Sequence, residues 1–229
     1  MYDRLELLIG DKVRELKEKA VLLLGLGGVG GYSFESLLRS GIGTIIVVDN
    51  DRFEESNLNR QLLSNLNNIG NYKVDEALKR KEIINLECQV IKIKEFITKD
   101  NIDMLFKYKI DFVIDAIDTV DIKKLIIKNC LEKKIKFISV MGTGNKLDSA
   151  RLEIMDIRKT MYDPLAKIIR KYVNSEHLKG KVPVVSSFEK PIKNEKVGSN
   201  AFVPAVAGLL AANYAVLELL RGNLWWKNL

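Results

Sequence analysis

The sequence predicts an α/β fold with a doubly wound, mainly parallel sheet. Over residues 20–140, short apolar runs alternate with segments of helical length, which implies right-handed crossovers between parallel strands. The first run, residues 20–25, is apolar throughout, as is typical of a strand buried on both faces. A glycine-rich segment follows it and opens a helix. Together these observations predict a Rossmann-like core.

The elements of this core are expected in a regular order. Each strand is a short run rich in Ile, Val or Leu, and each helix is longer and mixed in polarity. Gly41 and Gly43 are expected to end the first helix, as glycines do at helix C-termini. Residues 3–19 are charged and amphipathic and predict a helical lead-in. The expected strands cover residues 20–25, 44–49, 89–94, 112–115 and 136–140, and the expected helices cover 28–40, 71–84 and 121–133.

The second half of the chain is less regular. Strands are expected at residues 151–155 and 182–186, a helix at 162–173 and a polar loop at 190–199. We expect this half to extend the same sheet and to cover its active edge. The chain would then be a single domain, residues 1–229. Its parts are a lead-in (1–19), a core (20–140) and an extension (141–229) that forms the substrate side and dimer contacts.

The longest apolar stretch, residues 202–220, predicts a buried core helix. It contains Pro204 and Gly208 and carries Asn213 and Glu218, so it lacks the uninterrupted apolar length of a membrane span. Trp225 and Trp226 follow it beside a lysine. This tail suits peripheral contact with a membrane or a dimer partner. Packing of the tail against the body of the protein is the preferred alternative.

Charge and cysteine content exclude some classes of protein. The net charge is +7, which suits a polyanionic partner such as nucleic acid, although a general lysine bias would give the same value. Cys88 and Cys130 form no CxxC pair, and His177 is the one histidine. Four Cys or His ligands are needed for a structural zinc, so no zinc site is expected. A disulfide framework is equally unexpected, and the composition fits a reducing cytoplasm.

The glycine-rich segment has the pattern GxGxxG. Its glycines are Gly25, Gly27, Gly28 and Gly30, placed between a strand and a helix. Such glycines let a backbone approach phosphate closely, and the helix N-terminus offers amide donors. Asp49 ends the next strand, where an acid can accept ribose hydroxyls. The pair indicates a nucleotide site. The alternative is that the glycines serve only the packing of helix on strand.

Downstream residues distinguish ATP from a nicotinamide cofactor. Asp51 follows Asp49, and then come the segments 57–61 (NLNRQ), Lys73 and 115–118 (DAID). Hydride transfer has no use for an arginine and a lysine near a pyrophosphate. In adenylation, pyrophosphate leaves and negative charge builds on its oxygens, which Arg and Lys donors and a bound Mg²⁺ stabilise.

These motifs, in this order and spacing, resemble the ubiquitin-activating-like superfamily over residues 1–140. The resemblance implies an adenylation fold like that of the ubiquitin-activating enzymes, with ATP and Mg²⁺ as cofactors. It implies that Asp49 holds the ATP ribose, that Arg60 and Lys73 contact the phosphates, and that Asn57 helps to position them. Asp118 would bind Mg²⁺ beside the α-phosphate. Arg4 matches an arginine that reaches into the partner subunit's site, which implies a homodimer.

Each of these residues has a structural alternative. Arg60 and Lys73 would otherwise be solvated surface charges, as most Arg and Lys are. Asp118 would be a helix N-cap, and Asp51 a residue that only shapes a turn. Arg4 would be an ordinary charge at the start of a helix.

The second half resembles one branch of the superfamily, the tRNA threonylcarbamoyladenosine dehydratases. The similar segments are residues 141–144 (MGTG), 151–160 (RLEIMDIRKT), 163–166 (DPLA), 183–187 (PVVSS), 189–191 (EKP), 198–199 (GS) and 202–204 (FVP). The resemblance implies that ATP activates the threonyl carboxylate of a modified adenosine in tRNA as an acyl-adenylate, and that an internal nitrogen or oxygen then closes a ring. It also implies a monovalent cation, Na⁺ or K⁺, without assigning its ligands.

Three other functions stay open at this stage. An adenylyltransferase for a ubiquitin-like sulfur-carrier protein would share the first half, but such enzymes usually carry the CxxC pairs that this chain lacks. A nicotinamide oxidoreductase would share the glycine pattern. A module that binds nucleotide without catalysing a reaction would share both the first half and the glycine pattern. Lysines and an arginine of the second half are expected to help hold tRNA, or else to form a solvated face; they are Lys167, Arg170, Lys171, Lys179, Lys181, Lys190, Lys193 and Lys196.

Overall fold

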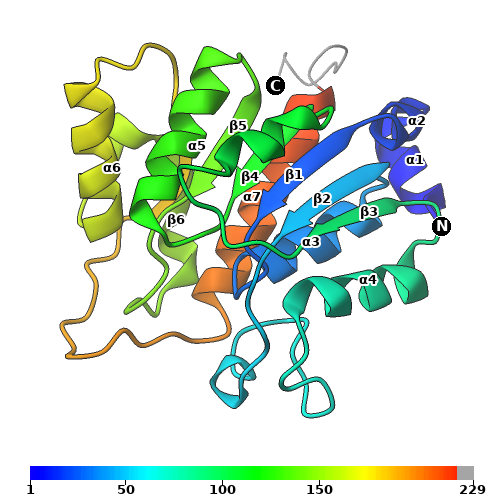
Figure 1. Ribbon diagram of the computed structural model, residues 1–229, viewed down its shortest axis with the longest axis horizontal. Helices are drawn as coiled ribbons and strands as arrows, with labels where there is room; N and C mark the ends of the chain where they lie inside the picture. The colour runs from blue at the N-terminus through cyan, green and yellow to red at the C-terminus, as the bar shows by residue number, and fades with distance from the viewer. Residues whose placement is uncertain (221–229) are drawn as a thin grey trace.

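The computed structural model describes residues 1–220, so the predicted role of Trp225 and Trp226 lies outside the described residues. Figure 1 shows one twisted sheet with helices on both faces. The sheet has seven strands in the order β3-β2-β1-β4-β5-β7-β6. Every neighbouring pair is parallel except β6 with β7. The predicted α/β class and mainly parallel sheet are confirmed.

The strands agree closely with the sequence prediction. They are β1 (Ala20–Leu24), β2 (Thr44–Val48), β3 (Gln89–Ile93), β4 (Phe112–Asp115), β5 (Lys136–Val140), β6 (Leu152–Asp156) and β7 (Pro183–Ser187). The helices are α1 (Asp3–Ile9), α2 (Lys12–Lys17), α3 (Gly30–Arg39), α4 (Lys73–Ile84), α5 (Val120–Glu132), α6 (Pro164–Ser175) and α7 (Val203–Leu220), with short 3₁₀ turns η1 (Glu55–Asn57), η2 (Ile102–Lys107), η3 (Ser149–Arg151) and η4 (Ile157–Lys159).

Two hydrophobic cores lie on opposite faces of the sheet. Alternate side chains of β1 point to opposite sides, so Val21 and Leu23 join one core and Leu22 and Leu24 the other. The first core packs under α3, α4 and α7, and the second under α5 and α6. In Figure 1, α5 and α6 lie in front of the sheet and α7 behind it. Burial on both faces explains why β1 is continuously apolar.

The second half extends the same sheet, as predicted. β7 pairs in parallel with β5, and β6 closes the edge as an antiparallel neighbour of β7. α7 has the length and composition of a membrane span, yet it packs on α3 and on the sheet. A Cβ at Gly208 would collide with the carbonyl of Val29, so the two helices approach closely. The prediction of a core helix is confirmed.

Four of the predicted helices differ from the structure by two residues or more. The lead-in is broken at Gly10, which has φ 61° and separates α1 from α2. α3 begins at Gly30 rather than at residue 28, because residues 25–29 form the loop between β1 and the helix. These two differences fall at glycines, where local packing decides whether a helix continues. In addition, α4 begins at Lys73 rather than at residue 71, and α6 covers Pro164–Ser175 rather than 162–173.

Candidate functional site

The carboxyl ends of β1, β2 and β4 meet around the glycine loop. Gly25 has φ +87° and donates its N–H to the carbonyl of Val48 at 2.8 Å. A Cβ on Gly25 would lie 2.9 Å from the carbonyl oxygen of Ala116, and a Cβ on Gly30 would collide with the carbonyl of Gly25. Only glycine fits at these two positions. The loop is therefore a tight turn that leads into α3, the geometry that exposes helix amides to an anion.

The segment 55–61 lies directly against this loop. A Cβ on Gly28 would lie 3.4 Å from Cγ of Arg60, and one on Gly27 would lie 3.9 Å from Nε2 of Gln61. The structure thus brings Arg60 beside the glycine loop, from a distant part of the sequence. The guanidinium of Arg60 donates to the carbonyl of Ser56 at 2.7 Å and to Oδ1 of Asn59 at 2.9 Å.

Asn57 shapes the turn that presents Arg60. Its Oδ1 accepts a hydrogen bond from the N–H of Glu54 at 3.1 Å, and the Glu54 side chain accepts one from the Asn57 N–H. This reciprocal capping box defines η1. Asn57 is buried, so its side chain holds the turn and does not project from it.

Asp49 is tied to the glycine loop through its carboxylate. Its Oδ2 accepts a hydrogen bond from the N–H of Leu26 at 2.7 Å, and its Oδ1 accepts one from the N–H of Asp51 at 2.8 Å. The side chain is 7% exposed. Burial raises the pKa of this carboxyl, and the nearby Lys73 ammonium and the two backbone donors partly oppose the rise.

Lys73 is the first residue of α4 and is buried beside these acids. Its Nζ lies 2.8 Å from Oδ2 of Asp51 and 4.0 Å from Oδ2 of Asp49. Its N–H donates to the carbonyl of Asp51 at 3.0 Å, next to an antiparallel bridge between Arg52 and Tyr72. The backbone of residues 51–53 therefore fixes the start of α4. Asp51 does more than shape a turn, because it holds the ammonium.

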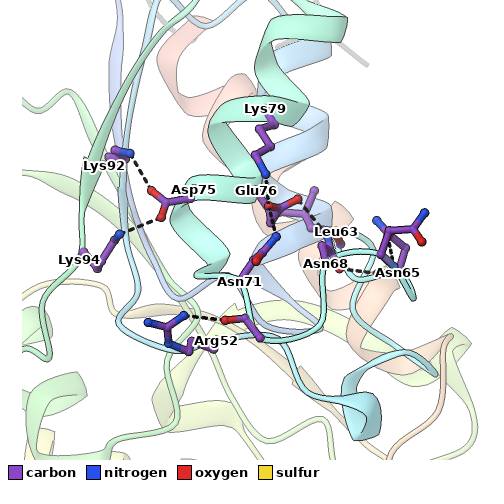
Figure 2. A network of polar contacts seen from close by, with 12 residues as sticks. Arg52, Leu63, Asn65, Asn68, Asn71, Asp75, Glu76, Lys79, Lys92 and Lys94 are labelled. Atoms are coloured by element: carbon purple, nitrogen blue, oxygen red, sulfur yellow. Dashed lines mark hydrogen bonds and ion pairs between the residues drawn. The ribbon is translucent and has the colours of Figure 1, made fainter.

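A polar network supports this end of α4 (Figure 2). Two acids of the first turn of α4 lie at its centre, where they also complement the helix dipole. Asp75 forms ion pairs with Lys92 and Lys94. Glu76 accepts hydrogen bonds from the side chains of Asn68, Asn71 and Lys79. The network ties α4 to β3 and to the preceding loop, which limits the positions that Lys73 can take.

Asp118 lies on the turn that follows β4. The turn packs against Gly25 through Ala116 and Ile117. Asp118 itself is exposed and has no hydrogen bond or ion pair with another residue in the described range 1–220. Thr119, not Asp118, takes the N-cap position of α5. The carboxylate is therefore available to a ligand at the edge of the glycine loop.

The exposed Asp118 carboxylate fits a magnesium ion that binds together with a nucleotide. Mg²⁺ in such sites is held by one or two carboxylates together with phosphates and water. Within residues 1–220 no group of three or more His, Cys, Asp or Glu is placed to hold a metal ion. Asp118 offers the single carboxylate that the nucleotide-bound mode requires.

Arg4 is not brought to this site within one chain. It is exposed on α1, which lies at the amino edge of the sheet (Figure 1). The neighbouring Tyr2 shows the same placement, because Asn85, at the end of α4 far from Lys73, donates to its hydroxyl at 2.6 Å. The role of Arg4 in a partner subunit's site stays a prediction.

Two features of the site were missed in the sequence. Gln61 is 7% exposed, and its Oε1 has no hydrogen-bond partner among the described residues, although it lies beside the glycine loop. Its place next to Arg60 was the available signal. The second feature is a buried ion pair of Lys123 with Asp115. In the sequence, nothing distinguishes an inward-pointing lysine from an exposed one on a helix of mixed polarity.

Both cysteines are buried free thiols. Burial raises the pKa of Cys88 to about 11 and raises that of Cys130 further, because an apolar environment disfavours the thiolate. Since the thiolate is the nucleophilic form, neither residue is suited to carry an acyl group.

Comparison with known proteins agrees with this geometry. The model of the ThiF family matches residues 2–221. A tRNA threonylcarbamoyladenosine dehydratase of Bacillus subtilis (strain 168) is 42% identical, over 96% of this chain and 94% of the relative. The crystal structure of E. coli tRNA N6-threonylcarbamoyladenosine dehydratase in complex with ATP matches with a TM-score of 0.91 at 31% identity, covering 96% of this chain and 93% of the other.

Matches to the adenylyltransferases are shorter. A probable molybdopterin-synthase adenylyltransferase of Gracilaria tenuistipitata var. liui is 33% identical over 129 residues, which is 56% of this chain and 36% of the relative. The dehydratases, in contrast, align through the second half as well. The chain therefore belongs to the ThiF family and shares nearly its full length with the tRNA threonylcarbamoyladenosine dehydratases within it.

Proposed function

We propose that this protein uses ATP to cyclise N6-threonylcarbamoyladenosine in tRNA, with net loss of water. The observation that carries the proposal is the convergence of Arg60, Lys73 and Asp49 on one glycine loop, with the exposed carboxylate of Asp118 beside it. ATP is the nucleotide in a solved structure of a dehydratase relative, and the dehydratases align over nearly the whole chain.

The reaction has two steps. A carboxylate oxygen of the threonyl group attacks the α-phosphorus of ATP, and the bond to the pyrophosphate oxygen breaks. An internal nitrogen or oxygen of the same substrate then attacks the activated carbonyl carbon, and AMP leaves as the ring closes. The attacking atom belongs to the substrate, so proximity supplies a high effective molarity and no enzyme nucleophile is needed. The buried, protonated thiols agree with this.

Each site residue has a defined task in the first step. The Asp49 carboxylate accepts hydrogen bonds from the ribose hydroxyls while the N–H groups of Leu26, in the glycine loop, and Asp51 occupy two of its other lone pairs. Arg60 and Lys73 donate to the phosphate oxygens on which charge accumulates. Bound Mg²⁺ would neutralise part of the charge on the phosphate oxygens. Asp118 would hold it.

The basic face of α6 is the surface we assign to tRNA. Lys167 and Lys171 are exposed there and line a surface hollow with Asn174 and Ser175. Arg170 lies in the same hollow but donates to the carbonyl and hydroxyl of Thr160 at 2.6 and 2.8 Å, so it is held by the protein. The two lysines are the cations that this hollow offers to a phosphate backbone.

Reversing these two charges should weaken tRNA binding and spare ATP binding. The double substitution Lys167→Glu/Lys171→Glu is expected to raise the KM for tRNA by roughly tenfold at 0.1 M salt and to reduce the salt dependence of binding by about one unit of slope per lost contact. Lys107→Glu/Lys109→Glu is the matched control, because both lysines are exposed before β4, at the amino edge. Equal effects from both doubles would show that only net charge matters.

The activity is tested directly with its substrate. The protein is incubated with ATP and total tRNA from cells that lack the enzyme, and the nucleosides are analysed by mass spectrometry. The expected product is a nucleoside lighter by one water, formed together with AMP and pyrophosphate. Adenylation of a Gly-Gly-ended carrier protein instead would favour the sulfur-carrier alternative. Saturable NADH binding without competition by ATP would favour an oxidoreductase. ATP binding without pyrophosphate release would favour a binding module.

The proposal includes the setting of the reaction. The chain acts as a single adenylation domain in a homodimer, in which Arg4 of each subunit reaches the site of the other. The site uses Mg²⁺ and a monovalent cation, Na⁺ or K⁺, and the enzyme works in the cytoplasm without zinc. Two free, buried cysteines are compatible with that reducing compartment.

A further inference from the structure

A charged cluster lies buried beneath the turn that carries Asp118. The ammonium of Lys123, on α5, is 0% exposed. It donates to Oδ2 of Asp115 at 2.8 Å, to Oγ of Ser139 at 3.1 Å and to the carbonyl of Val140 at 3.0 Å. The Ser139 hydroxyl donates to the same Asp115 oxygen at 2.6 Å. Three donors of the ammonium thus meet three acceptors, and the cluster is satisfied internally.

Stability of the fold alone does not account for this cluster. Removing two charges from water has a large desolvation cost, and apolar residues of similar volume often replace a buried pair with no loss of stability. The neighbours of the cluster on this face, Ile122, Ile126 and Ile127, are apolar. An apolar side chain at position 123 would continue that pattern.

The geometry connects the cluster to the proposed magnesium ligand. Asp115 is the last residue of β4, and its second oxygen, Oδ1, accepts a hydrogen bond from the N–H of Ile117 at 3.4 Å. The other side of the same turn packs on Gly25 through Ala116. The turn is therefore fixed between the glycine loop and the Asp115 carboxylate, and Asp118 is its next residue.

We propose that Lys123 is a positioning residue that holds Asp118 in place for the magnesium nucleotide by fixing the Asp115 carboxylate under the turn. The inference rests on the proposed function only in taking Asp118 as the magnesium ligand. Partners outside the first ligand layer typically change metal affinity or activity by about 10–100-fold when they are removed.

Nucleotide binding tests this without the tRNA reaction. Calorimetry measures the affinity for a non-hydrolysable ATP analogue with and without Mg²⁺, and the ratio gives the gain due to the metal. Asp118→Asn is the reference variant, because it is expected to remove most of the increase in affinity that Mg²⁺ gives. Lys123→Met is expected to reduce the gain by about 10–100-fold while the affinity without Mg²⁺ stays close to that of the wild type. Lys124→Met is the control, since Lys124 is adjacent, partly exposed and forms its ion pair with Asp121 at 2.8 Å.

A second variant separates positioning from folding. Lys123→Met alone leaves the Asp115 charge buried without its cation, which destabilises the protein. The double substitution Asp115→Leu/Lys123→Met removes both charges and restores an apolar interior. It is expected to unfold at a temperature near that of the wild type and still to lose the metal gain. A double variant that keeps the full gain would overturn the proposal, as would an Asp118→Asn protein with an unchanged gain. Failure of the tRNA assay alone would bear on the substrate and not on this inference.

Discussion

Replacing Arg60 with alanine is expected to lower ATP-dependent turnover by about 10²–10³-fold and to leave the fold intact. A preorganised donor aimed at developing charge contributes this much in related electrostatic sites. The guanidinium is partly exposed and bonds only to Ser56 and Asn59 of its own loop, so its loss removes no interaction between distant elements of the described chain. Pyrophosphate release at saturating tRNA gives the rate, and thermal unfolding checks the fold.

Arg39→Ala is the matched control for Arg60→Ala. Arg39 lies in the last turn of α3, at the end away from the glycine loop, and pairs with Glu35 at 2.7 Å. Its removal deletes the same charge without touching the site. Arg60→Lys is expected to recover only part of the rate, since an ammonium cannot make two parallel hydrogen bonds to a phosphate. An Arg60→Ala enzyme with the turnover of the control would contradict the assigned role.

All five strands of the predicted core appear within one residue of their expected ends. The central strands were predictable because they are buried on both faces and form continuous apolar runs such as Ala20–Leu24, whereas β3 is a partly exposed edge strand. Helix starts were less predictable. A glycine at the start of α3 can belong to the loop or to the helix, and contact with Ala116 and Gly25 decides it. The contact with Ala116 comes from the turn after β4, which is distant in sequence.

The site was predictable where a residue follows a strand end. Parallel strands place their carboxyl ends at one edge, which is why the glycine loop and Asp49 could be grouped from the amino-acid pattern alone, whereas Asp118 was placed beside them by the family resemblance. The buried ions were not predictable. Lys123, Lys146 and Asp163 are all buried, and Lys146 pairs with Asp163 at 2.8 Å, but surface residues of these types look the same in a sequence. Only tertiary packing distinguishes them.

Replacing Lys73 with methionine is expected to lower both turnover and stability. The substitution keeps the length of the stem, so the loss is chiefly that of the charge. Turnover should fall by about 10²-fold or more, because the donor that we propose for the phosphates is lost. Stability should fall by about 2 kcal/mol at neutral pH, because the buried Asp49 loses its nearest cation while it keeps its two backbone donors.

The pH dependence of the stability loss in Lys73→Met tests whether Asp49 is its source. Burial already raises the pKa of Asp49, and the Lys73 ammonium opposes that rise, so Lys73→Met should raise this pKa further. A carboxyl with a raised pKa in the folded state destabilises the protein once it is ionised, so stability is lost as pH increases from 3.8, its ordinary pKa, through the raised value. The deficit of Lys73→Met should therefore be largest near pH 7 and shrink as the medium is acidified.

Denaturant unfolding between pH 7 and pH 4 measures this deficit against a control on the same helix. Lys79→Met removes a lysine of α4 that is 65% exposed, and its partner Glu76 keeps the hydrogen bonds from Asn68 and Asn71. It should cost less than about 0.5 kcal/mol at every pH and should leave turnover unchanged. A Lys73→Met deficit that did not vary with pH would show that the ionised Asp49 carboxylate is not the source of the stability loss. The attraction between Lys73, on α4, and Asp49, beside the glycine loop, would then not explain why Lys73 is buried.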